Sequence, residues 1–127
     1  MTVRDTMKRD LIVVRADTPV AEAARLLIEH RITGLPVVDA ENHIVGVITE
    51  MDLMRTLGEP HRVWKTVSEL MTPDPFTIPV SEPLHVAFDC LMTHNFRRVL
   101  IEDKGKLVGL ISRTDLLPSI LEHLTHP

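Results

Sequence analysis

Two copies of a short motif carry the residue types in this 127-residue chain that are best suited to ligand chemistry. Residues 46–52 read GVITEMD and residues 109–115 read GLISRTD, so both copies follow the pattern Gly-x-x-Ser/Thr-x-x-Asp. Each copy lies between an expected strand and an expected helix. A single match arises by chance in roughly one chain in twenty of this size. The evidence for a function is therefore the presence of two copies of the motif, and not either copy alone.

The hydroxyl and the acid of each copy have a structural interpretation. Thr49 with Asp52, and Ser112 with Asp115, have the spacing of a capping box, in which side chains satisfy free N–H groups at a helix start. Capping alone needs no glycine three residues upstream, although a bulge or a close strand crossing would favour one. We therefore expect each pair to cap a helix.

The same residues have a ligand-binding interpretation in addition to capping. A hydroxyl and free N–H groups at a helix N-terminus favour a phosphate. A carboxylate can accept hydrogen bonds from both hydroxyls of a ribose, as in dinucleotide-binding folds. Glycine lets a ligand approach the backbone. We therefore expect Thr49, Asp52, Ser112 and Asp115 to bind a nucleotide-like ligand.

The two motif copies belong to a tandem repeat. A shift of 64 positions aligns Met7 with Met71 and Pro19 with Pro83, and after one deletion a shift of 63 aligns the motifs. Each half is expected to contain an opening turn, a strand, a helix, a hairpin and a second helix. In the first half these are residues 3–7, 11–14, a helix with Pro19 at its first position and Gly34 at its end, 35–38 with 44–48, and 50–57. In the second half they are residues 67–71, 76–78, a helix from Pro83, 99–101 with 107–111, and 113–121 with a kink near Pro118.

This order predicts an α/β fold made of two β-α-β-β-α repeats. The repeats are expected at residues 1–57 and 67–127, joined by a linker at 58–66. A single half of about 60 residues exposes too much of its sheet to be stable alone. We therefore expect the two halves to pack sheet to sheet about a pseudo-two-fold axis.

Composition excludes several classes of protein. The net charge of −4 argues against a general nucleic-acid binder. A single cysteine, Cys90, excludes an intramolecular disulfide and a Cys-rich zinc site, and no histidine pair has zincin spacing, so no metal is expected. The charged start does not suit a signal peptide, and no run approaches the roughly 18–20 apolar residues of a membrane span. We expect a cytoplasmic protein without a nucleic-acid or membrane partner.

The chain resembles a tandem pair of cystathionine-β-synthase (CBS) domains, also called a Bateman module. The resemblance rests on the doubled motif, on LPVVD at residues 35–39 with its copy VLIED at 99–103, and on the opening Val-x-Asp/Glu-x-Met at 3–7 and 67–71. It covers residues 3 to 121. It implies a regulatory module without catalysis that binds an adenosine ligand in clefts between the repeats: AMP first, or ADP, ATP or S-adenosylmethionine. It also implies a homodimer in which four repeats form a flat disc.

The resemblance assigns Thr49 and Asp52 to one cleft and Ser112 and Asp115 to the other. Family members place basic residues just before the Pro-Val segment, where this chain has Arg97 and Arg98 in the second repeat. The first repeat has Thr33 and Gly34 there, followed by Pro36. Adenine contacts are implied for residues near the first strand of each repeat: Val13, Val14, Thr77 and Ile78.

These substitutions predict an asymmetry between the clefts. If each cleft joins the hydroxyl and acid of one repeat to the basic residues of the other, Arg97 and Arg98 complete the Thr49/Asp52 cleft. The Ser112/Asp115 cleft would then bind more weakly or take an uncharged ligand. Alternatively, the two arginines are a solvated pair at a helix exit.

Two other functions stay open at this stage. One is a ligand-free module for dimerisation or protein interaction, and the other is an enzyme acting on nucleotides, for which the sequence offers no base positioned by a second group. An effector protein is implied for a regulatory module, but the sequence does not identify it.

Overall fold

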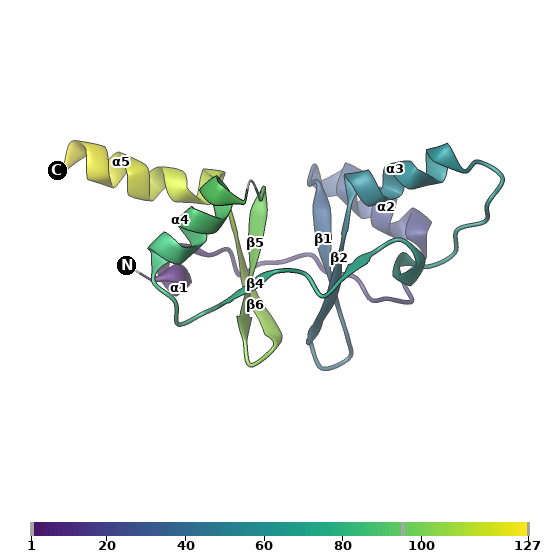
Figure 1. Ribbon diagram of the computed structural model, residues 1–127, viewed down its shortest axis with the longest axis horizontal. Helices are drawn as coiled ribbons and strands as arrows, with labels where there is room; N and C mark the ends of the chain where they lie inside the picture. Colours follow the sequence, from purple (N-terminus) through teal and green to yellow (C-terminus); the bar gives the residue numbers. More distant parts are fainter. Residues whose placement is uncertain (1, 95, 127) are drawn as a thin grey trace. The chain divides into compact units, whose positions relative to one another are not determined.

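The computed structural model describes residues 2–94 and 96–126, which divide between two compact units. Unit 1 contains Met1–Leu11 and Phe76–Pro127, and unit 2 contains Ile12–Pro75. Each unit has its own three-stranded sheet and its own helices (Figure 1). The mixed α/β class predicted from the sequence is confirmed. Residues 1 and 127, the outer limits of the predicted repeats, lie outside the described residues.

Unit 2 is built on an antiparallel sheet with the strand order β1-β2-β3. Helices α2 and α3 lie side by side next to the hairpin of β1 and β2 (Figure 1). The elements of this unit are α2 (Val20–His30), β1 (Gly34–Val38), β2 (Ile44–Thr49), α3 (Glu50–Gly58), the 3₁₀ turn η1 (Val67–Glu69) and β3 (Thr72–Pro73). The hairpin predicted from two apolar runs and a polar turn is present. The strand predicted at residues 11–14 is not formed, because only Val14 pairs there, in an isolated parallel bridge with Val37.

Unit 1 repeats this plan with a mixed sheet of order β4-β5-β6, in which β4 and β5 are parallel and β5 and β6 antiparallel. Its elements are α1 (Val3–Thr6), β4 (Thr77–Pro79), α4 (Leu84–Thr93), β5 (Arg98–Asp103), β6 (Lys106–Ser112), the 3₁₀ turn η2 (Thr114–Leu116) and α5 (Leu117–Thr125). The break predicted near Pro118 is confirmed, because a 3₁₀ turn precedes α5 and Pro118 lies in the first turn of α5.

The opening segment of each sequence repeat is incorporated into the other unit. In unit 1, Lys8 exchanges two backbone hydrogen bonds with Leu110 of β6, with N···O distances of 2.9 and 3.0 Å. In unit 2, β3 pairs with β2, with Thr72 opposite Val47. The sequence repeat therefore correctly predicts two similar units, but each folded unit combines segments from both repeats.

Two details of the predicted helix ends are wrong by a few residues. Pro19 is the N-cap of α2, one position before the first helical residue. The helix ends at His30, and its C-cap Arg31 takes the left-handed conformation (φ 53°) and donates its N–H to the carbonyls of Leu27 and Ile28. Gly34 is instead the first residue of β1.

Among the described residues, no helix is long and apolar enough to cross a membrane.

Each unit has its own hydrophobic core between the sheet and the helices. Alternate strand residues point into these cores, so their neighbours lie on the opposite face of the sheet. The fully buried strand residues are Ile78, Val99, Ile101 and Ile111 in unit 1 and Leu35, Val37 and Ile48 in unit 2. Burial of each such side chain stabilises the fold by about 1.5–3 kcal/mol.

Candidate functional site

The first motif copy lies where β2 of unit 2 passes into α3. Thr49 is the last residue of β2 and the N-cap of α3. Its N–H and hydroxyl donate to Asp52 Oδ2 at 2.9 and 3.1 Å, and the Asp52 N–H donates back to Thr49 Oγ1 at 3.3 Å. The predicted capping box is confirmed. It fixes the carboxylate directly beside the end of the sheet.

The second copy gives nearly the same arrangement in unit 1. The Ser112 N–H and hydroxyl donate to Asp115 Oδ2 at 2.7 and 2.9 Å, and the Ser112 and Thr114 hydroxyls lie 3.0 Å apart. Asp115 lies in the 3₁₀ turn η2, however, and not in an α-helical first turn. The prediction that Ser112 caps a helix is therefore wrong, because the N-cap of η2 is Arg113 and that of α5 is Leu116, and neither has a side-chain cap. The hydroxyl–carboxylate hydrogen bonds are nevertheless the same as in the first copy.

In each pair a single carboxylate oxygen, Oδ2, accepts the hydrogen bonds from the Ser or Thr residue, and Oδ1 takes no part in them. In unit 1, Asp115 Oδ1 lies 3.6 Å from the ammonium of Lys8. The Asp115 side chain is only 9% exposed, whereas that of Lys8 is 63% exposed. A half-engaged carboxylate in a fixed orientation can accept a further hydrogen bond from a hydroxyl group.

Strand register places three of the predicted ligand residues of unit 1 on one face of its sheet. Arg98 is the cross-strand partner of Ser112, and Thr77 is the partner of Leu100. Because Ile78 and the other core residues point toward the helices, Thr77, Arg98 and Ser112 lie on the opposite face. Unit 1 thus brings a guanidinium-bearing residue and the hydroxyl of the motif to the same end of one sheet.

Unit 2 brings together the corresponding residues without the positive charge. Gly34 pairs with Thr49, and Pro36 with Val47, on the face opposite the core. The Glu50 N–H donates to the Thr33 carbonyl at 3.0 Å, so Thr33 adjoins the same junction. The equivalent registers of Gly34 with Thr49 and of Arg98 with Ser112 show that the two junctions correspond position by position.

Two of the residues implied for adenine contact point away from this face. Val14 and Ile78 are 5% and 1% exposed and belong to the hydrophobic cores of their units, so only their backbone groups are available to a ligand. The neighbouring Val13 is exposed. Arg97 and Arg98 belong to unit 1, and Thr49 and Asp52 to unit 2. Their combination in one site stays a prediction.

The glycines of the two motifs are explained by close strand crossing. A Cβ atom built on Gly46 would lie 2.9 Å from both the Met71 sulfur and the Thr72 carbonyl oxygen. A Cβ built on Gly109 would lie 2.7 Å from Met7 Cγ and still closer to its sulfur. The methionine of each opening segment therefore fills the space that the glycine leaves, which supports the structural alternative for this position.

Sequence reasoning missed the contribution of the opening segments to the site. Lys8, which follows Met7, reaches Asp115, and the aligned Thr72 follows Met71 on β3. The repeated methionine was a visible signal for a shared role. It did not reveal which sheet each segment joins.

A turn with potential metal ligands lies in the β1–β2 hairpin. Ligand atoms of Asp39, Glu41 and His43 come within 4.8 Å of one another. Asp39 Oδ1 already accepts the N–H groups of Glu41 and His43, both at 2.9 Å. These bonds, above all the one from the His43 N–H, lower the pKa of Asp39. We therefore assign this cluster to the structure of the turn.

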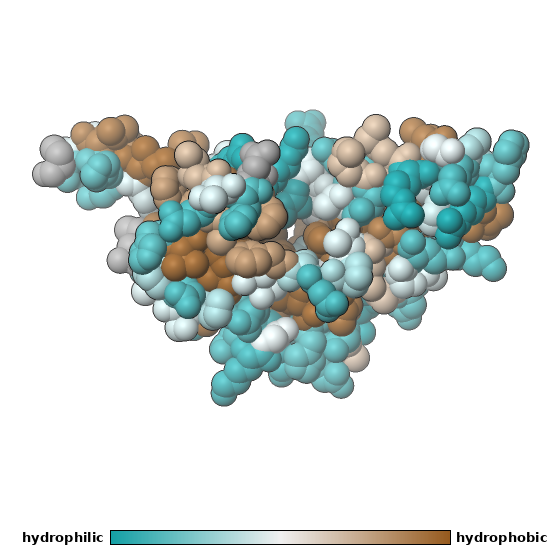
Figure 2. Space-filling model, in the orientation of Figure 1, coloured by the Kyte–Doolittle hydropathy of each residue, from teal (hydrophilic) through white to brown (hydrophobic). Residues whose placement is uncertain are grey.

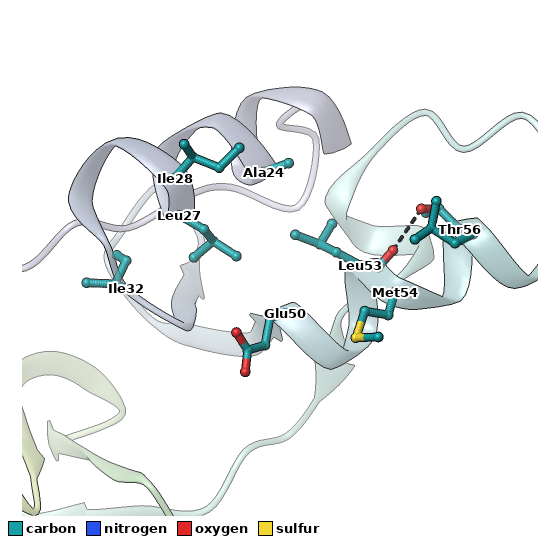
Figure 3. A pocket seen from close by; sticks show the side chains of 9 residues that line it. Ala24, Leu27, Ile28, Ile32, Glu50, Leu53, Met54 and Thr56 are labelled. Atoms are coloured by element: carbon teal, nitrogen blue, oxygen red, sulfur yellow. Dashed lines mark hydrogen bonds between the residues drawn. The ribbon is translucent and has the colours of Figure 1, made fainter.

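An apolar groove of about 470 Å³ separates α2 from α3 in unit 2 (Figure 3). Leu27 and Leu53 point toward each other across it, and the Glu50 carboxylate lies at one end. The Thr56 hydroxyl is turned back to the Leu53 carbonyl at 2.7 Å. With its apolar lining, this groove suits another apolar surface better than a nucleotide.

The family model for the CBS domain matches residues 3–59 and 67–122. Among curated proteins, the chain is 34% identical over 146 residues to the chloroplastic CBS domain-containing protein CBSX1 of Arabidopsis thaliana, covering 92% of this chain and 62% of that protein. It is 34% identical to 22% of the inosine-5'-monophosphate dehydrogenase of Aquifex aeolicus, covering 84% of this chain. The chain thus spans about three-fifths of the length of CBSX1 and only a part of a related enzyme.

Solved structures agree with these matches. The crystal structure of CBSX2 in complex with AMP is 35% identical with a TM-score of 0.88, covering 97% of this chain and 98% of that one. The CBS domain pair of protein MJ0100, in complex with 5'-methylthioadenosine and S-adenosyl-L-methionine, is 27% identical with a TM-score of 0.81 and covers 97% and 98%. Together with the duplicated motif and the two matching units, these findings show that the chain belongs to the CBS domain family, as a tandem pair of CBS domains.

Proposed function

We propose that this chain binds an adenosine ligand at each of its two strand-to-helix junctions, with AMP as the first candidate. One observation carries the proposal: in both units the hydroxyl and the N–H of a Ser or Thr donate to one oxygen of the Asp three residues later and leave the other oxygen out of this pairing. A ribose hydroxyl can donate to that oxygen. The AMP complex of CBSX2 and the S-adenosylmethionine complex of the MJ0100 pair support this ligand class.

The proposed function is regulatory and not catalytic. Each of the two aspartates accepts hydrogen bonds from the hydroxyl and the N–H of its own motif, which is the arrangement of a structural and binding group and not of a general base held by a second titratable group. In the related dehydrogenase the matched region is about a fifth of the protein, so most of that enzyme lies outside it. A ligand signal would require a partner protein that distinguishes the bound from the free state.

We further propose that a second copy of the chain covers the exposed apolar faces of the helices. Neither α3 nor α5 contains a buried residue, although both are amphipathic. Apolar side chains gather along α5 (Figure 2). The exposed residues are Met51, Met54 and Leu57 on α3 and Leu117, Ile120, Leu121 and Leu124 on α5. Because both units carry such a face, a two-fold dimer can bury both at once.

Ligand binding is tested by thermal shift and calorimetry with AMP, ADP, ATP and S-adenosylmethionine. Ligand at a hundred times its dissociation constant adds about 2.7 kcal/mol to the stability of the folded state. We expect stabilisation of the wild-type protein and its loss in the double variant Asp52→Asn/Asp115→Asn. The matched control is Asp103→Asn, an exposed aspartate at the far end of β5. If no adenosine compound stabilises the wild type, the ligand-free interaction module replaces this proposal.

The dimer is tested by light scattering coupled to size-exclusion chromatography. We expect the wild-type chain to elute as a dimer and Ile120→Glu/Leu124→Glu to elute as a folded monomer. His123→Glu, an exposed residue on the same helix, serves as the control. A monomeric wild type at micromolar concentration would contradict the proposed dimer.

A further inference from the structure

The groove between α2 and α3 of unit 2 corresponds to residues in and around α4, η2 and α5 of unit 1. The repeat shifts of 64 and 63 align the residues that line it with residues of that second surface. Most aligned pairs are similar in type: Leu27 with Leu91, Ile28 with Met92, Ile32 with Phe96, Leu53 with Leu116, Met54 with Leu117, Thr56 with Ser119, and Leu57 with Ile120. The remaining pairs differ in type, because Ala24 is aligned with Phe88 and Glu50 with Arg113.

The first difference between the two surfaces is one of shape. Ala24 is half-buried, and its methyl group leaves the groove of about 470 Å³ open (Figure 3). At the aligned position of unit 1, Phe88 on α4 is 46% exposed. Aromatic side chains act as anchors in protein interfaces when they are inserted into an apolar hollow of the partner. Each chain therefore carries both a hollow and an exposed ring, but in different units.

The second difference is one of charge. The Glu50 carboxylate lies at one end of the groove (Figure 3), whereas Arg113 has the aligned position in unit 1. Arg25 on α2 is likewise aligned with Asp89 on α4, and all four residues are exposed. Two copies that pair unlike units bring opposite charges into one interface. Pairing of like units brings equal charges together, which is unfavourable.

The groove is also continuous with the helix faces for which we propose a dimer contact. Met54 and Leu57 line the groove and are exposed on α3, and the aligned Leu117 and Ile120 are exposed on α5. A second copy that covers the α3 face therefore covers the groove as well. Since the complementary ring and charges belong to this same chain, a second copy is the occupant that the surface favours.

On these grounds we propose that unit 1 of one copy docks on unit 2 of a second copy, with Phe88 inserted into the groove between α2 and α3. A two-fold axis forms this contact twice, so each copy inserts one ring and receives one. Pairing of like units would leave the grooves unfilled. The inference rests on the proposed dimer and states which unit of one copy faces which unit of the other.

Two substitutions test the contact between the ring and the groove. The dissociation constant of the dimer is measured by analytical ultracentrifugation. We expect Phe88→Ala, which removes the ring, and Ala24→Phe, which fills the groove, each to raise this constant about tenfold or more. The double variant Ala24→Phe/Phe88→Ala exchanges the ring and the hollow, so it should recover most of the lost affinity. Additive losses in the double variant would contradict a direct contact between the two positions.

Phe76→Ala is the matched control for the removal of the ring. Phe76 is also an exposed phenylalanine of unit 1, but it lies just before β4 and not on α4. Its substitution should leave the dissociation constant of the dimer unchanged. Cooperative thermal unfolding, followed by circular dichroism, shows whether each variant is folded. If Ala24→Phe does not fold, cross-linking with smaller substitutions replaces it.

Disulfide cross-linking tests the orientation of the two copies. In a Cys90→Ala background, which removes the native thiol, Ala24→Cys and Phe88→Cys are made as two separate proteins. When they are mixed under oxidising conditions, we expect a disulfide-linked dimer that contains one copy of each, identified by its mass. Each protein alone should give no cross-linked dimer, because its introduced thiol faces a residue without one.

The results separate the orientation from the proposals on which it rests. If Ala24→Cys or Phe88→Cys cross-links to itself, like units pair, and this inference fails while the proposed dimer stands. A dimer that neither cross-links in the mixture nor responds to Phe88→Ala also overturns the inference. A monomeric wild type overturns the dimer and the inference together, and leaves the groove to a different protein. None of these results bears on adenosine binding, which is measured independently by thermal shift.

Discussion

Replacing Gly109 by alanine tests how the motif glycines act. The added Cβ would lie 2.7 Å from Met7 Cγ and 3.0 Å from Met7 Cβ, with the sulfur closest of all. Met7 is nearly buried, and the backbone bonds of Lys8 to Leu110 prevent the segment from simply moving away. Overpacking of this kind costs about 1–3 kcal/mol. We therefore expect the free energy of unfolding to fall by that amount.

The change is measured by urea unfolding followed by circular dichroism, and by thermal unfolding. At this chain length, each kcal/mol lowers the melting temperature by roughly 3–6 °C. Gly58→Ala is the matched control, because a Cβ there meets no atom within 4 Å. Gly58 is the last residue of α3, so alanine should be neutral or should stabilise the helix by up to about 1 kcal/mol.

A double-mutant cycle assigns the cost to the contact with Met7. In a Met7→Ala background, Gly109→Ala should lose most of its effect, which gives a coupling of about 0.5–3 kcal/mol. Two results would refute the reasoning. One is a Gly109→Ala protein as stable as Gly58→Ala, and the other is a cost that is the same with and without the Met7 side chain. In either case the glycine would serve the ligand or the strand itself.

Three further predictions concern stability and reactivity. Thr49→Ala, which removes the cap of α3, should lower the unfolding free energy by about 0.5–2 kcal/mol in urea titrations, whereas Thr49→Ser should retain it. The N–H groups of Thr66 and Lys65 lower the pKa of Glu69. The ionised Glu69 side chain therefore contributes fully to the free energy of unfolding above its ordinary pKa of 4.5, and this contribution is lost as the pH falls below that value. The free energy of unfolding of Glu69→Gln should accordingly depend less steeply on pH in the acid range than that of the wild type. Burial raises the pKa of the Cys90 thiol, so at neutral pH an aromatic disulfide reagent should label the folded chain much more slowly than the unfolded chain, and equal rates would contradict the buried placement.

Local features of this fold could be predicted from the sequence because they depend on neighbouring residues. The Thr49–Asp52 cap and the Ser112–Asp115 hydrogen bonds follow from a spacing of three, and the hairpins follow from apolar runs around polar turns. The end of α2 could not be predicted in the same way. Glycine is the usual residue in the left-handed position, but here Arg31 occupies it, and the preference of Gly34 for a turn did not decide its conformation.

The pairing of the opening segments was beyond prediction for a different reason. Residues 3–8 and 67–72 occupy equivalent positions in the repeat, and each carries the methionine that fits over a motif glycine. Either segment therefore suits either sheet by local complementarity. Only the complete fold shows that Met7 lies over Gly109 and Met71 over Gly46. Lys8 could not be assigned to Asp115 without that information.

The residues of the motif have two separate roles where the opening segment crosses the sheet. The glycine leaves room for the opening segment to cross the sheet, while the hydroxyl hydrogen-bonds to one carboxylate oxygen of the acid and leaves the other oxygen out of the pairing. Because the methionine is fixed over the glycine, the residue that follows it comes to lie beside the acid, as Lys8 does beside Asp115. The motif itself is the same in both units, so any difference between the two junctions must come from residues outside it, such as Lys8 in unit 1 and the aligned Thr72 in unit 2.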